Sequence, residues 1–457
     1  MITAKAFAGK HYAVYGLARS GIATVEALLA SGARVTAWDA KEEARAKLLP
    51  GTGRGTAERQ LGGGGVDPSV STDVLPPPRS GEGLVIANLD TADLAQFDSL
   101  VVTPGLPLNR HPIASRARNA GVGIIGDIEL FARARPELPP HKVVGITGTN
   151  GKSTTTALIH HILKTAGVQT TMGGNIGLPI LALDPLSEGG VYVLELSSYQ
   201  IDLTQNLDCD VAVLLNITPD HLDRYESFEA YAASKARLFE MQSAQRIAVV
   251  DEYAEAEDDV LDNATDPWIL FIDREAVGNQ LNWPALQGPH NLQNAQAATA
   301  VCRSLGLSNE QIEEGLRTYP GLPHRMERIR EKDGVVFVND SKATNPTAAA
   351  PALAAFEKIR WICGGQAKTD NLDECSAYFD HVAKAYTIGE AGELFASLLS
   401  PHMAVSECQT LERAVGTAAA EAQKGDTVLL SPACASFDQF RDFEDRGDQF
   451  RRLVEAL

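Results

Sequence analysis

The sequence predicts an α/β fold of three domains, each built on a mostly parallel sheet. Apolar strand-like runs alternate with helical patterns along most of the 457 residues, which is typical of parallel sheets covered on both faces. The length exceeds that of one ordinary domain. Proline-rich stretches at 136–140 and 319–323 interrupt the alternation. We therefore expect a Rossmann-like domain over 1–137, a central domain over 138–321 and a Rossmann-like domain over 322–457.

Composition excludes several classes of protein. The net charge of −19 argues against non-specific binding to nucleic acid. No apolar run approaches the ~18 residues that a membrane span needs, and Met1–Lys5 leads into a strand rather than a signal-peptide core. The six cysteines are scattered without metal-type pairing, which fits a reducing compartment. We expect a cytoplasmic protein with no nucleic-acid partner and no membrane insertion.

The first domain opens with a strand and a glycine-containing turn. The strand Tyr12–Tyr15 leads into Gly16-x-Ala18-x-x-Gly21, and a second strand ends at Asp39. This spacing resembles a dinucleotide fingerprint, except that Ala18 replaces the glycine that lets a backbone approach a pyrophosphate. NAD binding, binding of a UDP-type diphosphate and tight helix–strand packing all remain open at this point.

Residues from about 50 to 83 break the pattern. The segment contains Gly62–Gly65 and Pro76–Pro78 and has no apolar periodicity. Such a composition cannot bury enough apolar surface to offset chain entropy. We expect a disordered surface insertion, with regular structure resuming at Ser99–Val102.

The central domain carries the strongest motif. An apolar strand, Val143–Ile146, precedes Gly148-Thr149-Asn150-Gly151-Lys152-Ser153-Thr154, and a helical pattern follows. This order is the context of a P-loop, in which backbone N–H groups and a helix N-terminus bind phosphate. Lys152 can reach the β- and γ-phosphates, and the Ser153 hydroxyl can ligate Mg²⁺. The glycines stand at 145 and 148 rather than at 146, so the spacing is not the general one.

Three further side chains of this domain have both a functional and an ordinary interpretation. Glu195 closes an apolar strand and could hold Mg²⁺ beside a P-loop, or it could be a solvated strand end. His221 follows the strand Val211–Asn216, where α/β sheets bind ligands, although a lone histidine is by default a surface residue. From the residues alone, Lys235 is a solvated lysine on a helix.

Polar residues also follow later strands. Asn291 and Asn294 lie three apart on an alanine-rich helix and could contact a base or ribose, whereas an N-cap is the ordinary role of Asn291. The loops 339–345, 364–368 and 431–436 each follow a strand and are rich in small and polar residues. Three such loops predict a substrate crevice in the third domain.

These stretches together resemble the Mur ligase family. The Gly148–Ser153 turn is shared by that family and by folylpolyglutamate synthetases, whereas Gly173–Gly177, Asp340–Asn345 and Leu430–Phe440 resemble the branch that adds D-glutamate. The resemblance covers the whole chain except the insertion. It implies ATP-driven amide synthesis in the making of peptidoglycan precursors. The carboxylate of UDP-N-acetylmuramoyl-L-alanine attacks the γ-phosphate of ATP, and the D-glutamate amine then displaces phosphate from the acyl phosphate.

The resemblance also implies roles for individual residues. It implies that the first domain binds the UDP-sugar, the second binds ATP and the third binds the amino acid. Two Mg²⁺ sites are implied as well, and a monomer is the expected state. The catalytic residues are Lys152, His221 and Lys235. The ATP contacts are Gly148, Thr149, Asn150, Gly151, Lys152, Ser153, Thr154, Asn291, Asn294, Arg325 and Asp340. The UDP-sugar contacts are Arg19, Ser20, Asp39 and Asn175. The D-glutamate contacts are Thr344, Lys368, Ser436 and Phe443. The Mg²⁺ ligands are Ser153 and Glu195 at one site, and His221 and a carbamylated Lys235 at the other.

One residue departs from the family pattern, because Ala40 stands where a contact to uracil is expected. Three alternatives are weighed against the ligase. An NAD-dependent dehydrogenase is disfavoured by Ala18 and by the loops of the third domain. A non-catalytic nucleotide switch would not need Lys368 and Ser436. A ligase for L-glutamate stays open, because stereochemistry at one carbon cannot be read from the sequence.

Overall fold

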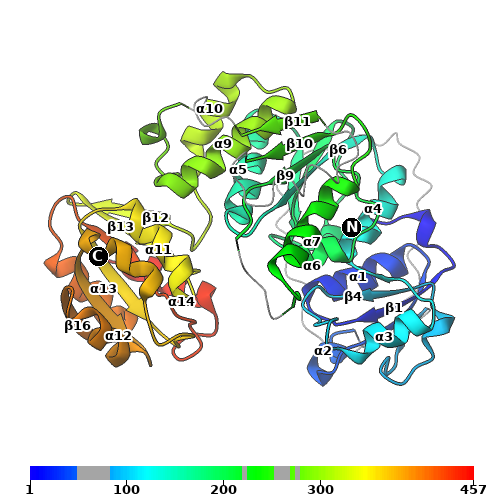
Figure 1. Ribbon diagram of the computed structural model, residues 1–457, viewed down its shortest axis with the longest axis horizontal. Coiled ribbons are helices and arrows are strands. Elements are labelled where there is room, and N and C mark those ends of the chain that lie inside the picture. Colours follow the sequence, from blue (N-terminus) through cyan, green and yellow to red (C-terminus); the bar gives the residue numbers. More distant parts are fainter. Residues whose placement is uncertain (49–82, 219–223, 252–267, 273–277) are drawn as a thin grey trace. The chain divides into compact units, whose positions relative to one another are not determined.

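The computed structural model describes residues 1–48, 83–218, 224–251, 268–272 and 278–457 (Figure 1). The insertion expected at about 50–83 lies outside these residues except at its last position. The described chain forms two compact units. One comprises Met1–Lys152 with Val168–Phe271, and the other comprises Ser153–Gly167 with Ile272–Leu457.

The first unit begins with a five-stranded parallel sheet in the order β3-β2-β1-β4-β5. Its strands are β1 (His11–Tyr15), β2 (Arg34–Trp38), β3 (Leu84–Ile86), β4 (Ser99–Val102) and β5 (Ile124–Ile125). Its helices are α1 (Arg19–Ala30), α2 (Glu42–Ala46), α3 (Pro112–Asn119) and α4 (Asp127–Ala134). The strand order reverses between β1 and β4, and open α/β sheets bind ligands at such a switch point.

The turn between β1 and α1 needs glycine at two positions. Gly16 has φ +97°, a conformation that residues with a side chain rarely adopt. A Cβ at Gly21 would overlap the carbonyl oxygen of Gly16. The glycines of the predicted fingerprint therefore serve the tight turn and the close approach of α1 to β1, whereas Ala18 fits without strain at the N-cap of α1 with φ −71°.

The first unit continues with a six-stranded parallel sheet in the order β11-β10-β9-β6-β8-β7. Its strands are β6 (His141–Thr147), β7 (Thr170–Gly174), β8 (Gly190–Glu195), β9 (Val211–Leu214), β10 (Ile247–Val250) and β11 (Trp268–Phe271). Helices α6 (Ser198–Asp202) and α7 (Phe228–Glu240) belong to the same unit, and α5 (Lys152–Thr165) follows β6. Because β6 lies between β9 and β8, the segments that follow these three strands share one edge of the sheet.

One apolar core joins the two sheets of this unit. Side chains of α1 and α4, such as Val25 and Phe131, belong to the same buried cluster as Tyr192 and Leu194 of β8. A shared core fixes the first sheet against the central one. The first sheet and the central sheet therefore share one compact unit, whereas Ser153–Gly167 and the residues from Ile272 onward belong to the other unit. Contacts between sheets far apart in sequence cannot be read from strand patterns.

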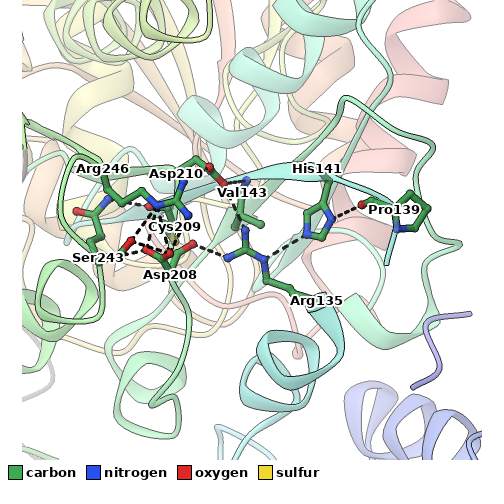
Figure 2. Close-up of polar contacts among 10 residues, drawn as sticks. Arg135, Pro139, His141, Val143, Asp208, Cys209, Asp210, Ser243 and Arg246 are labelled. Carbon is green, nitrogen blue, oxygen red and sulfur yellow. Dashed lines mark hydrogen bonds and ion pairs between the residues drawn. The ribbon is translucent and has the colours of Figure 1, made fainter. Parts of the chain in front are cut away.

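A polar network anchors the segment that leads into β6 (Figure 2). Arg135 donates to Nε2 of His141 at 3.2 Å and forms an ion pair with Asp210 at 3.3 Å. Asp210 also accepts from the amide of Val143 at 2.8 Å and pairs with Arg246 at 2.5 Å. Because His141 and Val143 belong to β6, the network holds this strand at the end opposite the P-loop.

The second unit contains a six-stranded sheet in the order β12-β13-β17-β14-β15-β16. All neighbours are parallel except β12 and β13. Its strands are β12 (Glu327–Lys332), β13 (Val335–Asn339), β14 (Ile359–Gly364), β15 (Val382–Ile388), β16 (Ala404–Gln409) and β17 (Thr427–Leu430). Its helices are α9 (Pro289–Ser304), α10 (Asn309–Thr318), α11 (Pro346–Ala355), α12 (Gly392–Leu399), α13 (Leu411–Glu421) and α14 (Phe443–Glu455).

Both faces of this sheet are covered, as the sequence predicts. Trp361 of β14 packs in the cluster that includes residues of α11 and α12. The next residue, Ile362, packs in the cluster that includes residues of α13 and α14. Alternate residues of a strand point to opposite faces, so a strand covered on both faces must be apolar throughout.

The α/β class and its largely parallel sheets are thus confirmed, and three sheets fall within the three predicted ranges. The domain boundaries at 137 and 321 stay predictions. No helix in the described part of the chain is long and apolar enough to span a membrane.

Candidate active site

A cleft of about 380 Å³ opens at the switch point of the first sheet. Arg19 and Ser20, after β1, and Thr103, after β4, line one part of it, while Asn175 and Gln200 contribute from the central sheet. Among the described residues, the amides of Arg19, Ser20 and Gly21 in the first turn of α1 have no hydrogen-bond partner. A helix N-terminus with free amides in a cleft is suited to a diphosphate.

The four predicted UDP-sugar contacts lie in this unit, but only three of them line the cleft. Arg19 donates to the carbonyl oxygen of Gly177 at 2.8 Å. Asp39 accepts from the amides of Leu17 and Lys41 at 2.7 and 2.8 Å and thereby fixes the turn after β1. The structure brings Arg19, Ser20 and Asn175 together and assigns Asp39 a structural contact beside them.

The predicted P-loop connects β6 to α5. Gly148 has φ +146° and Gly151 has φ +84°. A side chain at Gly148 would crowd Leu215 and Asn216 of the segment after β9. Asn216 also holds the loop, because its carbonyl oxygen accepts from the amide of Thr149 at 2.9 Å and its Oδ1 accepts from the amide of Asn150 at 2.8 Å. Sequence reasoning missed this role of Asn216, because its partners lie in a distant segment.

Two lysines meet at the P-loop. The Nζ of Lys152 donates to the carbonyl oxygens of Gly148 at 2.9 Å and Thr149 at 2.8 Å. The Nζ of Lys235 donates to the same oxygen of Gly148 at 2.9 Å and lies 4.5 Å from the ring centroid of Tyr231. Lys235 is only 1% exposed. The interpretation of Lys235 as a solvated helix lysine is therefore wrong, because α7 packs this side chain against the loop.

Glu195 ends β8 and is buried, with 2% of its surface exposed. Its interpretation as a solvated strand end is therefore wrong. The Oε1 atom accepts from Nδ2 of Asn175 at 2.8 Å, while Oε2 is buried and has no hydrogen-bond partner. A buried carboxylate oxygen without a partner is costly unless a ligand satisfies it, and carboxylate oxygen is the ligand type that Mg²⁺ prefers. The residues at this place therefore fit a divalent cation.

In the second unit, predicted nucleotide residues lie at the start of α5 and on α9. The hydroxyl of Ser153 accepts from Nη2 of Arg325 at 3.1 Å. Thr155 donates to Oδ1 of Asn294 at 3.2 Å, and Nδ2 of Asn294 donates to Oδ1 of Asn291 at 3.2 Å. The two asparagines thus share a helix face, as predicted. Asn291 is not the N-cap of α9, however, because Gly288 occupies that position and Asn291 lies inside the first turn.

Asp340 lies at the end of β13 and is buried. Its Oδ1 accepts from the amide of Met326 at 3.1 Å, and its Oδ2 accepts from the hydroxyl of Ser431 at 2.8 Å. Burial raises the pKa of the Asp340 carboxyl to about 7. Asp340 therefore links the segment around Arg325 to β17, and its charge depends on pH near neutrality.

The predicted D-glutamate residues come from the loops after β13, β14 and β17 and from the start of α14. The three strands are neighbours in the sheet, which brings the three predicted loops to one edge. Nζ of Lys368 donates to Oγ1 of Thr344 at 3.4 Å. Ser436 is buried, and Phe443 is half-buried at the first position of α14.

Arg446 ties these loops together, and the sequence analysis missed it. The side chain is fully buried and donates to Oγ and O of Ser341 at 2.9 and 2.8 Å and to the carbonyl oxygen of Cys434 at 3.0 Å. Burial lowers the pKa of the Arg446 guanidinium to about 10. The sequence around the start of α14 is polar, so a charged residue there is expected to be exposed to solvent. The partners of Arg446 are mostly backbone carbonyls, which leave no signal in the sequence.

His221 lies outside the described residues. Within the described part of the chain, no three His, Cys, Asp or Glu side chains gather as a metal cluster. Thr154 continues α5 as a half-buried residue. Among the predicted Mg²⁺ ligands in the described part of the chain, Glu195 has a buried oxygen without a hydrogen-bond partner. The complete ligand sets stay predictions.

Comparisons with known families match two parts of the chain. Residues 146–284 match the model of the Mur ligase middle domain. Residues 324–434 match the model of the Mur ligase glutamate ligase domain. The two matches cover the P-loop and the three loops around Arg446.

Curated relatives match along the whole chain. The chain is 56% identical to a UDP-N-acetylmuramoylalanine--D-glutamate ligase of Novosphingobium aromaticivorans, with 100% of this chain and 97% of that protein covered. It is 55% identical to the ligase of the same name from Sphingopyxis alaskensis, with 100% of both covered. It is 53% identical to that of Zymomonas mobilis, again with 100% of both covered.

Solved structures share the fold at low sequence identity. A MurF ligase from Thermotoga maritima in complex with ADP has a TM-score of 0.56 at 19% identity, covering 76% of this chain and 92% of that one. A UDP-N-acetylmuramate-alanine ligase, MurC, from Thermotoga maritima has a TM-score of 0.55 at 17% identity, covering 98% of this chain and 99% of that one.

Proposed function

The chain belongs to the Mur ligase family, and on this premise we propose that it joins D-glutamate to UDP-N-acetylmuramoyl-L-alanine with conversion of ATP to ADP. The names of its curated relatives, UDP-N-acetylmuramoylalanine--D-glutamate ligases, support this reaction and a role in peptidoglycan synthesis. The observation that carries this proposal is the match to curated ligases of this name over the full chain.

The P-loop supports ATP as the energy source. A carboxylate is a poor electrophile, so an amide forms readily only after the carboxylate has been activated. Lys152 would exchange its bonds to Gly148 and Thr149 for phosphate oxygens, because an ammonium binds a phosphate more strongly than a neutral carbonyl. The substrate carboxylate then attacks the γ-phosphate, ADP leaves, and an acyl phosphate forms. Catalysis of this step is mostly positioning and neutralisation of charge.

The cleft at the first sheet is proposed to bind the UDP-sugar. The free amides of α1 and Arg19 offer donors to a diphosphate.

The amine of D-glutamate, held by Lys368, Thr344, Ser436 and Phe443, attacks the acyl phosphate and releases inorganic phosphate. Lys368 is the cation of this set and is suited to a carboxylate of the amino acid.

Magnesium is proposed at Glu195 through its free oxygen Oε2. Bound there, Mg²⁺ would neutralise charge on the phosphates of ATP. The same proposal includes Ser153 as a further ligand of this Mg²⁺. It also includes a second Mg²⁺, held by His221 and a carbamylated Lys235. Carbamylation would turn Lys235 from a cation into an anion. A monomer in the cytoplasm remains the expected state.

A phosphate-release assay tests the proposed function. Purified protein is incubated with ATP, Mg²⁺ and UDP-N-acetylmuramoyl-L-alanine, and D- and L-glutamate are compared. Phosphate release with D-glutamate alone, together with a product heavier by one glutamyl residue, supports the proposal. Equal or greater turnover with L-glutamate would contradict the stereochemical assignment. Hydride transfer to NAD without ATP turnover would favour the dehydrogenase alternative.

A further inference from the structure

Asn175 is bound to Glu195 at two points. Strand β7 runs beside β8 with Gly174 opposite Glu195. Gly174 has φ +90°, and a Cβ at this position would overlap the carbonyl oxygen of Glu195. This close approach lets the amide of Asn175 donate to the carbonyl oxygen of Glu195 at 2.9 Å, while Nδ2 of Asn175 donates to Oε1 at 2.8 Å.

The backbone bond holds Asn175 beside Glu195, and the side-chain bond orients the Glu195 carboxylate. With Oε1 engaged by Asn175, the carboxylate cannot rotate without losing a charge-assisted hydrogen bond. The other oxygen, Oε2, is buried and has no partner. The arrangement therefore presents a single, unsatisfied carboxylate oxygen in one direction. Outer groups that hold a ligating carboxylate in this way determine how well it binds a metal.

Asn175 also belongs to the cleft, where it lies with Arg19 and Gln200. Its side-chain amide carries two N–H groups, and the second remains available to a molecule in the cleft. One residue thus contacts both the carboxylate and the space assigned to the UDP-sugar. Among the described residues that line the cleft, Asn175 is the one whose side chain is hydrogen-bonded to Glu195.

We propose that Asn175 is a positioning residue that aims Oε2 of Glu195 at a divalent cation and couples that cation to the cleft. The inference rests on the proposed function, which places Mg²⁺ at Glu195. In this proposal the shared Asn175 couples the binding of a ligand in the cleft to the binding of a cation at Glu195. Such coupling is reciprocal, so each ligand changes the affinity for the other by the same factor.

The test measures metal binding directly, without turnover. Mn²⁺ is titrated into the full-length protein with saturating ADP, and bound ion is counted by electron paramagnetic resonance. Asn175→Leu removes the donor and keeps the size of the side chain, and Asn175→Ala serves as a second variant. We expect the Mn²⁺ dissociation constant to rise about 10-fold or more in both, the range found when an outer partner of a metal ligand is removed.

Two further variants separate positioning from general damage. Arg19→Ala alters the same cleft but does not touch Glu195, so it should weaken binding of the UDP-sugar and leave Mn²⁺ affinity as in wild type. Glu195→Gln should lose Mn²⁺ affinity, and adding Asn175→Leu to it should cause no further loss. In wild type, saturating UDP-sugar should change the Mn²⁺ dissociation constant, and Asn175→Leu should abolish this change.

The outcomes distinguish the inference from the proposed function. If wild type releases phosphate with D-glutamate but folded Asn175→Leu binds Mn²⁺ like wild type, the inference is wrong and the function stands. Additive losses in the double variant, or unchanged Mn²⁺ binding by Glu195→Gln, would also overturn it. Absence of D-glutamate-dependent phosphate release by wild type would instead refute the function.

Discussion

Lys152 and Lys235 donate to one and the same acceptor, the carbonyl oxygen of Gly148. The first lysine begins α5 and the second lies inside α7, so two helices direct ammonium groups at a single atom of the P-loop. Like charges this close repel each other in a buried setting. An anionic phosphate at Lys152, or conversion of Lys235 to a carbamate, would relieve that repulsion.

Replacement of Lys152 by alanine tests the P-loop. The variant is expected to lose about 10²-fold or more in kcat, comparable to the removal of one preorganised electrostatic donor. Phosphate release at saturating ATP measures this change. Because the side chain donates to backbone carbonyl oxygens of its own loop, Gly148 and Thr149, the variant should remain folded by circular dichroism. Ligation near the wild-type rate would exclude Lys152 from the phosphate site.

Replacement of Lys235 by alanine tests the carbamate. Activity is expected to fall by about tenfold or more, as for loss of a group that tunes a metal site. A small carboxylate such as acetate should restore part of it by occupying the gap. Wild-type protein stripped of bicarbonate should lose activity, and faster at acidic pH, where carbamates decompose. Mass spectrometry of the gently ionised protein gives an independent measure of the added CO₂.

The control for Lys235→Ala is Lys164→Ala. Lys164 lies in the last turn of α5 and has no role in the proposed mechanism. It should behave like wild type with and without bicarbonate. If Lys235→Ala retains full activity, or acetate has no effect on it, the carbamate assignment fails.

Lys368→Ala should weaken binding of the amino acid without weakening binding of the nucleotide to the same extent. Lys368 is exposed and contacts Thr344 from the loop after β14, so its loss should leave the fold intact. We expect the KM for D-glutamate to rise much more than the KM for ATP, because one charge-assisted hydrogen bond to a carboxylate contributes about 1.5–3 kcal/mol. Initial rates at varied D-glutamate and varied ATP measure both constants. An equal rise in the two would remove Lys368 from the amino-acid pocket.

Asp340 predicts a pH dependence of stability. Burial raises the pKa of this carboxyl to about 7, above its value in the unfolded chain, so the folded state binds the proton more tightly. The stabilising contribution is complete below the unfolded pKa of about 4 and is lost as pH rises to about 7. The side chain of the Asp340→Asn variant cannot ionise. It can still hydrogen-bond to the amide of Met326 and to the hydroxyl of Ser431. Its free energy of unfolding relative to wild type should therefore increase with pH, by up to about 1.4 kcal/mol per pH unit.

Denaturant unfolding at pH 5, 6, 7 and 8 measures this difference. The same variant should lose activity if Asp340 contacts the nucleotide, which separates its catalytic from its structural effect. A stability difference that does not change between pH 5 and 8 would show that Asp340 has the same proton affinity in both states.

Arg446→Met should destabilise the second unit and loosen the substrate loops. The change leaves the carbonyl oxygens of Ser341 and Cys434 without their donor, and a buried unsatisfied group costs about 1–3 kcal/mol. Thermal unfolding should show a lower midpoint, and the KM for D-glutamate should rise. Arg452→Met, on the exposed face of the same helix, is the matched control and should change neither. Wild-type values for Arg446→Met would contradict the role assigned to this side chain.

The sequence predicted those parts of the fold whose signal is local. Strands such as Val143–Ile146 are apolar because both faces of their sheets are covered, and the P-loop is a continuous motif. The burial of Lys235 and the role of Arg446 escaped prediction, because both depend on backbone carbonyls of distant segments. The link between Asn175 and Glu195 depends on the pairing of β7 with β8. The sequence of a strand does not indicate which other strand lies beside it.

The conformation of Gly174 has a consequence for inhibitor design. No side chain fits at this position, because a Cβ would overlap the carbonyl oxygen of Glu195. Gly16, in the turn that leads to Ala18 and Arg19 of the cleft, likewise has no room for a side chain, because a Cβ there would overlap Thr103. A compound anchored on the backbone of these two turns would face few viable escape mutations, since any amino acid that displaced it there would also disrupt the enzyme.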